Sequence, residues 1–125
     1  MTSENILMAV SKVSAMDLST YKNKAVVLDS DGKITAVTAS TDKPFGILYG
    51  EPVTDEAGSV IPIGPGGSAK VVAGATIDEG ASVSITADGS AGASTSGNYD
   101  IGICENGGAS GELIKVLLNN LVVKA

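Results

Sequence analysis

The sequence predicts an all-β protein, a compact antiparallel β-sandwich or barrel with an internal duplication and a short N-terminal arm. Two observations predict the fold class: many short apolar segments are separated by turn residues at regular spacing, and almost no segment carries a helical signal. A third observation predicts the duplication, because the same order of segments occurs twice along the chain.

Two pairs of short motifs mark the duplication. Each copy has an apolar run followed by an Asp-Gly turn, Asp31-Gly32 in the first and Asp88-Gly89 in the second, 57 residues apart. Each copy then has a strand built around a Gly-Ile pair, Gly46-Ile47 and Gly102-Ile103, 56 residues apart. An acidic, glycine-containing turn and a final strand close each copy. This nearly constant spacing predicts two related halves.

The length of 125 residues allows one domain with a single core. We expect an N-terminal arm over residues 1–16 and a β domain over residues 17–125, with the related halves at about 24–63 and 81–118. Small aliphatic side chains have to build the core, because the chain has one Phe, three Tyr and no Trp. Such a core predicts modest stability, and a partner surface would help it, which favours a homo-oligomer.

The arm carries five apolar residues outside the repeated unit: Ile6, Leu7, Met8, Val10 and Val13. Helical spacing and strand alternation both fit these residues, so periodicity alone does not decide their conformation. The absence of a strong cap favours an extended arm or an edge strand. We expect these five residues to contact a neighbouring subunit or another partner, since exposed apolar surface usually marks a partner site. The alternative is that the arm caps one edge of its own domain.

After the arm, Asp17 predicts the N-cap of one short helical turn that ends near Asn23. Strands are expected at residues 25–29, 34–38, 45–49, 60–63, 69–72, 82–86, 99–104 and 113–118. The two Asp-Gly pairs predict hairpins with type I′ turns. Pro62 indicates an edge strand or a bulge. Residues 64–67 are expected to be a loop, and the small residues 91–98 a flexible tip.

The charge of the chain excludes some partners. The net charge is −6, and all eight basic residues are scattered Lys, because the chain has no Arg. An acidic protein without a basic stripe is repelled by phosphates, which argues against binding of DNA or RNA. No apolar run approaches 18 residues, so no membrane-spanning helix is expected. The first residues, 1–5, lack the features of a secretory signal.

The sequence offers no active site, and we expect neither enzymatic activity nor a metal or organic cofactor. The chain has no His, the commonest general base and metal ligand. The segment 29–32 resembles the start of a calcium loop, but the remaining ligands are missing. The segment 64–69 fits a loose dinucleotide pattern, but a strand and not a helix is expected after it. Two acidic pairs, 55–56 and 78–79, are expected to lie in solvated turns. The single Cys104 sits in an apolar strand and is expected to be buried.

Several segments resemble those of phage capsid decoration or cement proteins, which are small β-rich head proteins with a repeated unit. The segments are Asp17-Leu18-Ser19 before residues 25–33, then residues 41–48, 70–80, 102–104 and 111–118. The resemblance spans about residues 17–118, and it depends on the order and spacing of the segments and not on a single motif.

The resemblance implies a virion structural protein on the outer surface of an icosahedral phage head. Its partner would be the major capsid protein, and copies would cement neighbouring capsomers against the internal pressure of the DNA. It also implies a homo-oligomer, with a trimer favoured. The alternative is a head-fibre base, or a tail or adhesin module that serves surface attachment. An adhesin that binds sugars usually presents aromatic platforms, and only four aromatic residues are scattered along this chain.

Overall fold

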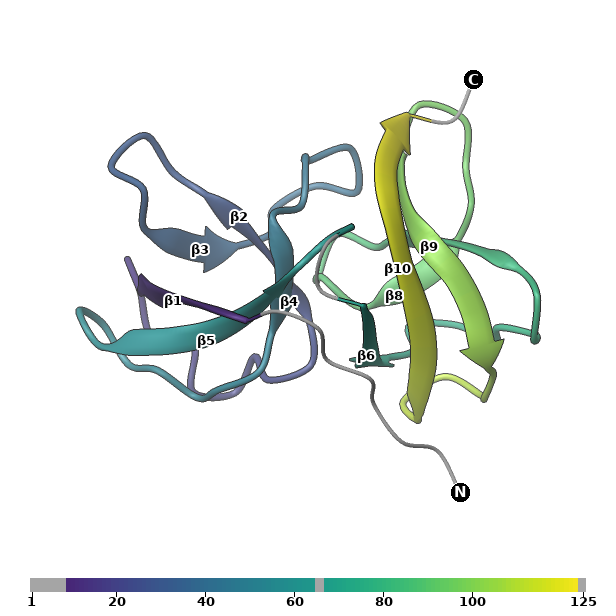
Figure 1. Cartoon of the computed structure of the whole chain (residues 1–125), viewed down its shortest axis with the longest axis horizontal. Coiled ribbons are helices and arrows are strands. Elements are labelled where there is room, and N and C mark those ends of the chain that lie inside the picture. The colour runs from purple at the N-terminus through teal and green to yellow at the C-terminus, as the bar shows by residue number, and fades with distance from the viewer. Residues whose placement is uncertain (1–8, 65–66, 124–125) are drawn as a thin grey trace.

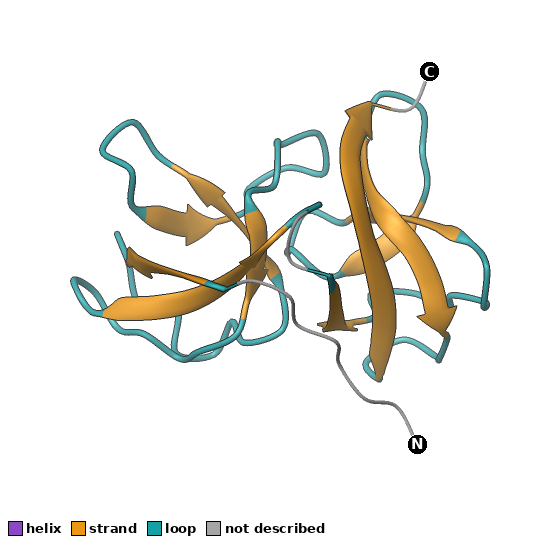
Figure 2. Cartoon of the chain, in the orientation of Figure 1, coloured by secondary structure: helices purple, strands orange, loops and turns teal. Residues whose placement is uncertain are grey.

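The computed structural model describes residues 9–64 and 67–123 and shows two β lobes that lie side by side (Figure 1). Within these ranges every regular element is a strand, as Figure 2 shows, and the predicted all-β class is confirmed. No helix of the described part is long and apolar enough to cross a membrane.

The first half is a five-stranded antiparallel sheet, on the left of Figure 1. Its strands are β1 (Val10–Val13), β2 (Ala25–Leu28), β3 (Ile34–Ala36), β4 (Gly46–Leu48) and β5 (Ala57–Pro62). They pair in the order β1-β5-β4-β2-β3. The two edge strands meet where Ser14, directly after β1, forms a parallel bridge with Ile34 of β3. The amide of Ala15 donates to the Ile34 carbonyl oxygen at 2.8 Å, so the sheet closes into a small barrel.

The second half repeats this plan. Its strands are β6 (Ser68–Val72), β7 (Ser82–Ile85), β8 (Ala91–Ala93), β9 (Tyr99–Asn106) and β10 (Leu113–Val123). They pair in the order β6-β10-β9-β7-β8, which is the order of the first half with each number raised by five. The closing bridge also recurs, between Ala73 and Ala91, with the Gly74 amide donating to the Ala91 carbonyl oxygen at 2.7 Å. The predicted duplication is therefore confirmed.

Backbone details recur in the two halves as well. A left-handed conformation is found at three equivalent places, and a glycine occupies each of them in the second half. The pairs are Asn23 and Gly80, Gly32 and Gly89, and Asp55 and Gly111. Residues other than Gly, Asn and Asp rarely adopt this backbone conformation. The two halves are therefore alike in the backbone of their turns as well as in their strands.

Strands β2, β4 and β5 of the first half bury residues on both of their faces. One face forms the interior of the first barrel, with Leu18, Val26, Ile34, Leu48 and Val60. The other face carries Ala25, Ile47 and Ile61, which we call the first-half row; all three are fully buried. They pack in one cluster with the apolar interior of the second half. Since neighbouring residues of a strand point to opposite faces, β2, β4 and β5 connect the two cores.

The two Asp-Gly hairpins form as predicted, but with a different turn type. The Asp29 amide donates to the Lys33 carbonyl oxygen at 2.9 Å, and the Gly32 amide donates to the Asp29 carbonyl oxygen at 3.1 Å. Of these turn residues only Gly32 has a positive φ, 75°, whereas a type I′ turn needs two such residues in succession. The predicted type I′ turn is therefore wrong. The connection is a three-residue loop with glycine in the left-handed position, and the hairpin at Gly89 has the same form.

The structure also moves the boundary of the N-terminal arm. The arm was predicted to cover residues 1–16, but Val10–Val13 is β1 and pairs with β5 of the first half, from Val10 opposite Val60 to Val13 opposite Ala57. This is the edge strand that the sequence analysis allowed for the segment. What the sequence did not show is its partner, β5, about fifty positions further along the chain. Residues 1–8 of the predicted arm lie outside the described residues.

Three further expectations differ from the structure. The predicted helical turn after Asp17 is a pair of tight turns, because Leu18 enters the first core with only 1% of its surface exposed. The predicted tip 91–98 contains β8, which pairs with β7. Pro62 is the last residue of β5, an interior strand, and lies beyond Val60, where the pairing with β1 ends. No residue of β1 pairs with Pro62, so the missing amide hydrogen of the proline breaks no hydrogen bond to β1.

Candidate interaction surface

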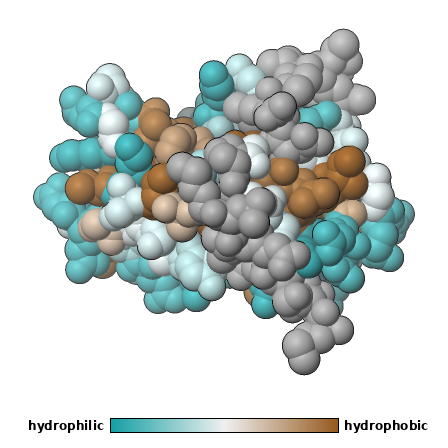
Figure 3. All heavy atoms as spheres, in the orientation of Figure 1, coloured by the Kyte–Doolittle hydropathy of each residue, from teal (hydrophilic) through white to brown (hydrophobic). Residues whose placement is uncertain are grey.

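Large apolar side chains are exposed on the outer face of β9 and β10. Ile103 is 42% exposed, Leu113 48% and Leu117 50%. Figure 3 shows hydrophobic residues gathered over these two strands, on the right of the view. Leu117 lies opposite Ile103 across the β10–β9 ladder, and Ile103 lies opposite the exposed Ser82 of β7. We call Ser82, Ile103 and Leu117 the second-half row.

Strand alternation explains why these residues point outward. Ile114, Val116 and Leu118 of β10 are buried in the core of the second half, so the residues between them face away from it. On β9 the same holds for Ile103, whose neighbour Cys104 is buried as predicted. Both strands are therefore apolar on two faces, of which the second half covers only one.

An ion pair borders the exposed apolar face. The Lys115 amine lies 2.8 Å from a carboxylate oxygen of Glu105, and the side chains are 7% and 46% exposed. Lys115 falls between Leu113 and Leu117 on β10, and its side chain, unlike theirs, is almost fully covered while its amine stays paired. The surface thus has an apolar centre with a charged border, which is the usual composition of a protein contact.

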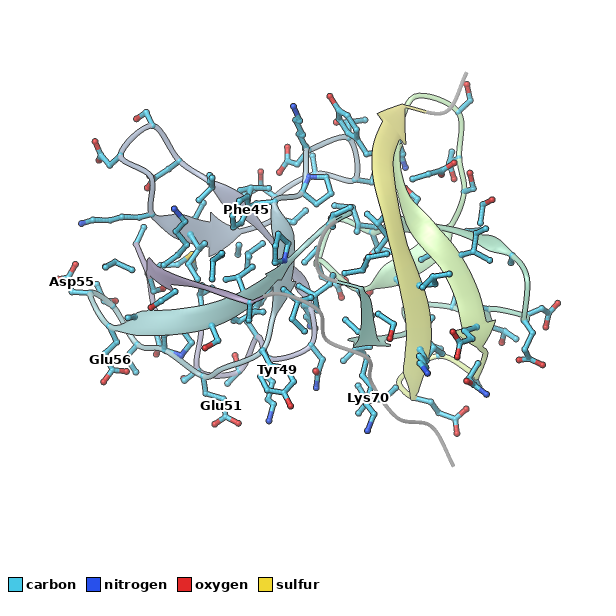
Figure 4. The ribbon with its side chains drawn as sticks, in the orientation of Figure 1. Phe45, Tyr49, Glu51, Asp55, Glu56 and Lys70 are labelled. Atoms are coloured by element: carbon cyan, nitrogen blue, oxygen red, sulfur yellow. The ribbon has the colours of Figure 1, made fainter. Side chains whose placement is uncertain are left out.

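The acidic pairs noted in the sequence lie in turns, as predicted. Figure 4 shows Asp55 and Glu56 pointing outward at the turn before β5. A carboxylate oxygen of Glu56 accepts a hydrogen bond from the Val53 amide at 2.9 Å. The equivalent Glu112 accepts one from the Ala109 amide at 2.6 Å. These carboxylates order the repeated turn and do not converge on a reaction site.

Asp88 has the most strongly shifted carboxyl group of the hairpins. Hydrogen bonds from the Ser90 hydroxyl, the Thr86 hydroxyl and the Ser90 amide lower the pKa of Asp88 to about 2. These bonds fix the β7–β8 turn, and that turn contacts the first half, because the Ala25 amide donates to the Gly89 carbonyl oxygen at 2.8 Å. The shifted group therefore has a structural role at the junction of the halves.

No catalytic or metal-binding arrangement is found in residues 9–64 and 67–123. No three His, Cys, Asp or Glu residues of this part are grouped closely enough to hold a metal ion. A shallow pocket lies between Ser40 of the first half and uncharged residues of the second. Its lining consists of Ser40, Ala75, Ile85, Thr86, Ala87, Gly92, Ala93, Thr95 and Asn98. None of these side chains is a general acid or base, so the pocket offers no reaction chemistry.

The predicted contact residues lie elsewhere. Val10 packs partly buried against the first core, and Val13 is 40% exposed, both on β1 of the first half. Ile6, Leu7 and Met8 lie outside the described residues. Sequence reasoning missed the exposed face of β9 and β10. The continuous apolar run 113–118 was a usable signal, because a strand that is apolar on both faces needs cover on both.

Comparison with known proteins shows a similar fold among solved structures. No family model matches the chain. No curated protein matches it in sequence. The fold is similar to that of the N base of the head fibre protein gp8.5 of bacteriophage phi29, with a TM-score of 0.68. The match covers 94% of this chain and 98% of the other at 16% sequence identity. At this identity, the likeness establishes the fold that the two proteins share.

Proposed function

We propose that this protein is a structural, non-enzymatic component of a phage head and binds the outer surface of the capsid. The observation that carries the proposal is the fold match to the N base of a head fibre, which extends over nearly the whole of both chains. The match therefore includes both halves of this protein and not only one repeated unit.

Two properties of the chain support an external position. Its net charge of −6, without Arg, is unfavourable for contact with packaged DNA. Its exposed apolar face on β9 and β10 is suited to contact with protein and not with nucleic acid. These properties favour the capsid shell over the DNA as the partner.

In its finer form the proposal is a cement protein, whose copies contact neighbouring capsid subunits and stabilise the head. A specific protein contact buries roughly 1,600 Å². An oligomer that spans several capsomers, with a trimer favoured, makes several contacts at once, so modest individual affinities multiply. Binding only to the assembled lattice stabilises that lattice by mass action.

The second candidate is the base of a head fibre, which attaches another structure to the capsid without strengthening it. The described function of the matching solved structure favours this candidate. The two candidates share the capsid as partner and differ in whether the head becomes more resistant to rupture.

The test compares phage heads with and without the protein. Purified protein is first sedimented with empty expanded capsids of its phage, and we expect it to co-sediment. Heads are then heated or treated with a chelator, and release of DNA is measured. Better retention of DNA in decorated heads supports cementing, and equal retention with bound protein supports the fibre base. Failure to co-sediment with the capsids overturns the proposed function.

A further inference from the structure

The exposed row of the second half has an equivalent in the first half. In the first half Ile61 lies opposite Ile47 across β5 and β4, and Ile47 lies opposite Ala25 across β4 and β2. In the second half Leu117, Ile103 and Ser82 occupy the same register on β10, β9 and β7. The two rows are thus equivalent positions of the repeat, with similar side chains.

The two rows differ in what covers them. Ala25, Ile47 and Ile61 are 0% exposed, because the second half packs on them. In the second-half row, Ile103 and Leu117 are 42% and 50% exposed. The molecule itself therefore shows which kind of surface covers such a row: another copy of the repeated unit.

One part of the covering surface is the end of the β7–β8 hairpin. Its Gly89 carbonyl oxygen accepts the Ala25 amide at 2.8 Å, and Gly89 lies so close to Tyr21 that an added Cβ would clash with the phenol oxygen. Ile85, at the base of this hairpin, is only 2% exposed. We call residues 85–90 the hairpin end of the second half.

The hairpin end of the first half, residues 28–33, is free. Leu28 occupies the position of Ile85 but is 40% exposed. Gly32 occupies the position of Gly89, and a Cβ added there would meet nothing within 4 Å. Each chain thus has one covered junction between a row and a hairpin end, and in addition one uncovered row and one uncovered hairpin end.

We propose that the second-half row binds the first-half hairpin end of a second copy of this chain, in the manner of the junction inside each chain. Such a contact is head-to-tail, because it joins two different surfaces. Each added copy brings a free row and a free hairpin end, so association continues until a ring closes or a chain of copies forms. The proposal concerns the isolated protein and does not depend on the proposed function.

The test uses one variant of each surface. Leu117→Asp places a charge in the row, and Leu28→Asp places one in the hairpin end. Because both residues are at least 40% exposed, neither change should unfold the protein. An unpaired carboxylate in an apolar contact should weaken association by about two orders of magnitude or more. Ile103→Asp is a second row variant, and Val53→Asp, exposed to 43% and outside both surfaces, is the matched control.

Mass is measured by sedimentation velocity over a wide range of concentrations, after circular dichroism and melting have confirmed that each variant is folded. We expect the wild type and Val53→Asp to associate with rising concentration, and each of the other variants to remain a single chain. An equimolar mixture of Leu117→Asp and Leu28→Asp should form a complex of two chains, since one copy keeps an intact hairpin end and the other an intact row.

Three results would overturn the proposal. The wild type could remain a single chain at every concentration, Leu28→Asp could associate alone through two identical rows, or the mixture could fail to form a pair. If the wild type stays a single chain while Leu117→Asp no longer co-sediments with capsids, the row is a capsid contact. The proposed function would then stand without this inference.

Discussion

Two glycines explain why the Gly-Ile pair is repeated in the sequence. A Cβ built on Gly46 would lie 2.5 Å from the Ile61 carbonyl oxygen, and one built on Gly102 would clash with the Leu117 carbonyl oxygen. In both halves the fourth strand approaches the fifth too closely for any side chain. The glycine of the motif is therefore required by the close approach of β4 to β5 and of β9 to β10.

We expect Gly102→Ala to lower the free energy of unfolding by about 1–3 kcal/mol, because β9 and β10 must separate to accept the methyl group. Urea unfolding measures the change. Gly50→Ala is the control, since a Cβ there has its nearest contact at 3.7 Å, and its effect should stay within about 1 kcal/mol. Equal effects of the two substitutions would contradict the close approach.

The lowered pKa of Asp88 predicts how the stability of the protein changes at low pH. Its pKa is lowered in the folded protein to about 2, so its contribution is complete above the pKa of the unfolded chain, ~4. That contribution is lost as the pH falls from about 4 to about 2. We expect Asp88→Asn to reduce the fall in melting temperature over this range. Asp31→Asn, at the equivalent place in the other hairpin, is the matched control, and an equal response of both variants would contradict the prediction.

At the scale of elements, β1 shows how the repeat is completed. Its register with β5 matches that of β6 with β10: Val10 lies opposite Val60, and Ala69 lies opposite Val116. Ser14, fully buried after β1, then closes the barrel against β3. The N-terminal strand is thus part of the first fold unit, and removing it would leave β5 with an open edge.

We expect deletion of residues 2–14 to unfold the first half or make the protein insoluble, because it removes β1 and the closing bridge. Deletion of residues 2–8 retains β1 and is the matched control, with a melting temperature close to that of the wild type. Circular dichroism and melting measure both. A stable fold without residues 2–14 would support the original interpretation of this segment as a separate contact arm.

At the scale of the whole molecule, the two halves share apolar contacts. The first-half row packs in one cluster with the interior of the second half. Backbone hydrogen bonds also cross the junction, from the Ala25 amide to Gly89 and from the Val72 amide to Asn23. Neither half can therefore unfold without exposing apolar surface of the other.

We expect thermal unfolding to be one cooperative transition for both halves. Ile47→Ala, at the junction, should cost about 2–5 kcal/mol and lower the transition of both halves together. Hydrogen exchange measured by mass spectrometry follows peptides of each half separately. Val53→Ala, on the exposed surface, serves as the control. Loss of protection in one half well before the other would contradict a shared core.

The sequence by itself determined the all-β class, the two hairpins and the duplication, because these depend on local turn chemistry and on the spacing of motifs. It also indicated the burial of Cys104. It left residues 10–13 open between an extended arm and an edge strand, and the structure shows the edge strand β1. It did not reveal β8 or the turns after Asp17, since their conformation follows from distant partners. The predicted contact role of Val10 and Val13 stays a prediction.

Only the tertiary structure decided which repeated residues are buried and which are free. Ile47 and Ile103 each follow the glycine of a Gly-Ile pair, and the sequence treats them alike. Ile47 is fully buried and Ile103 is 42% exposed, because the second half packs on the row of the first and nothing in the described chain packs on the row of the second. A duplicated sequence encodes two equivalent surfaces, and the packing of one half on the other leaves one of them uncovered.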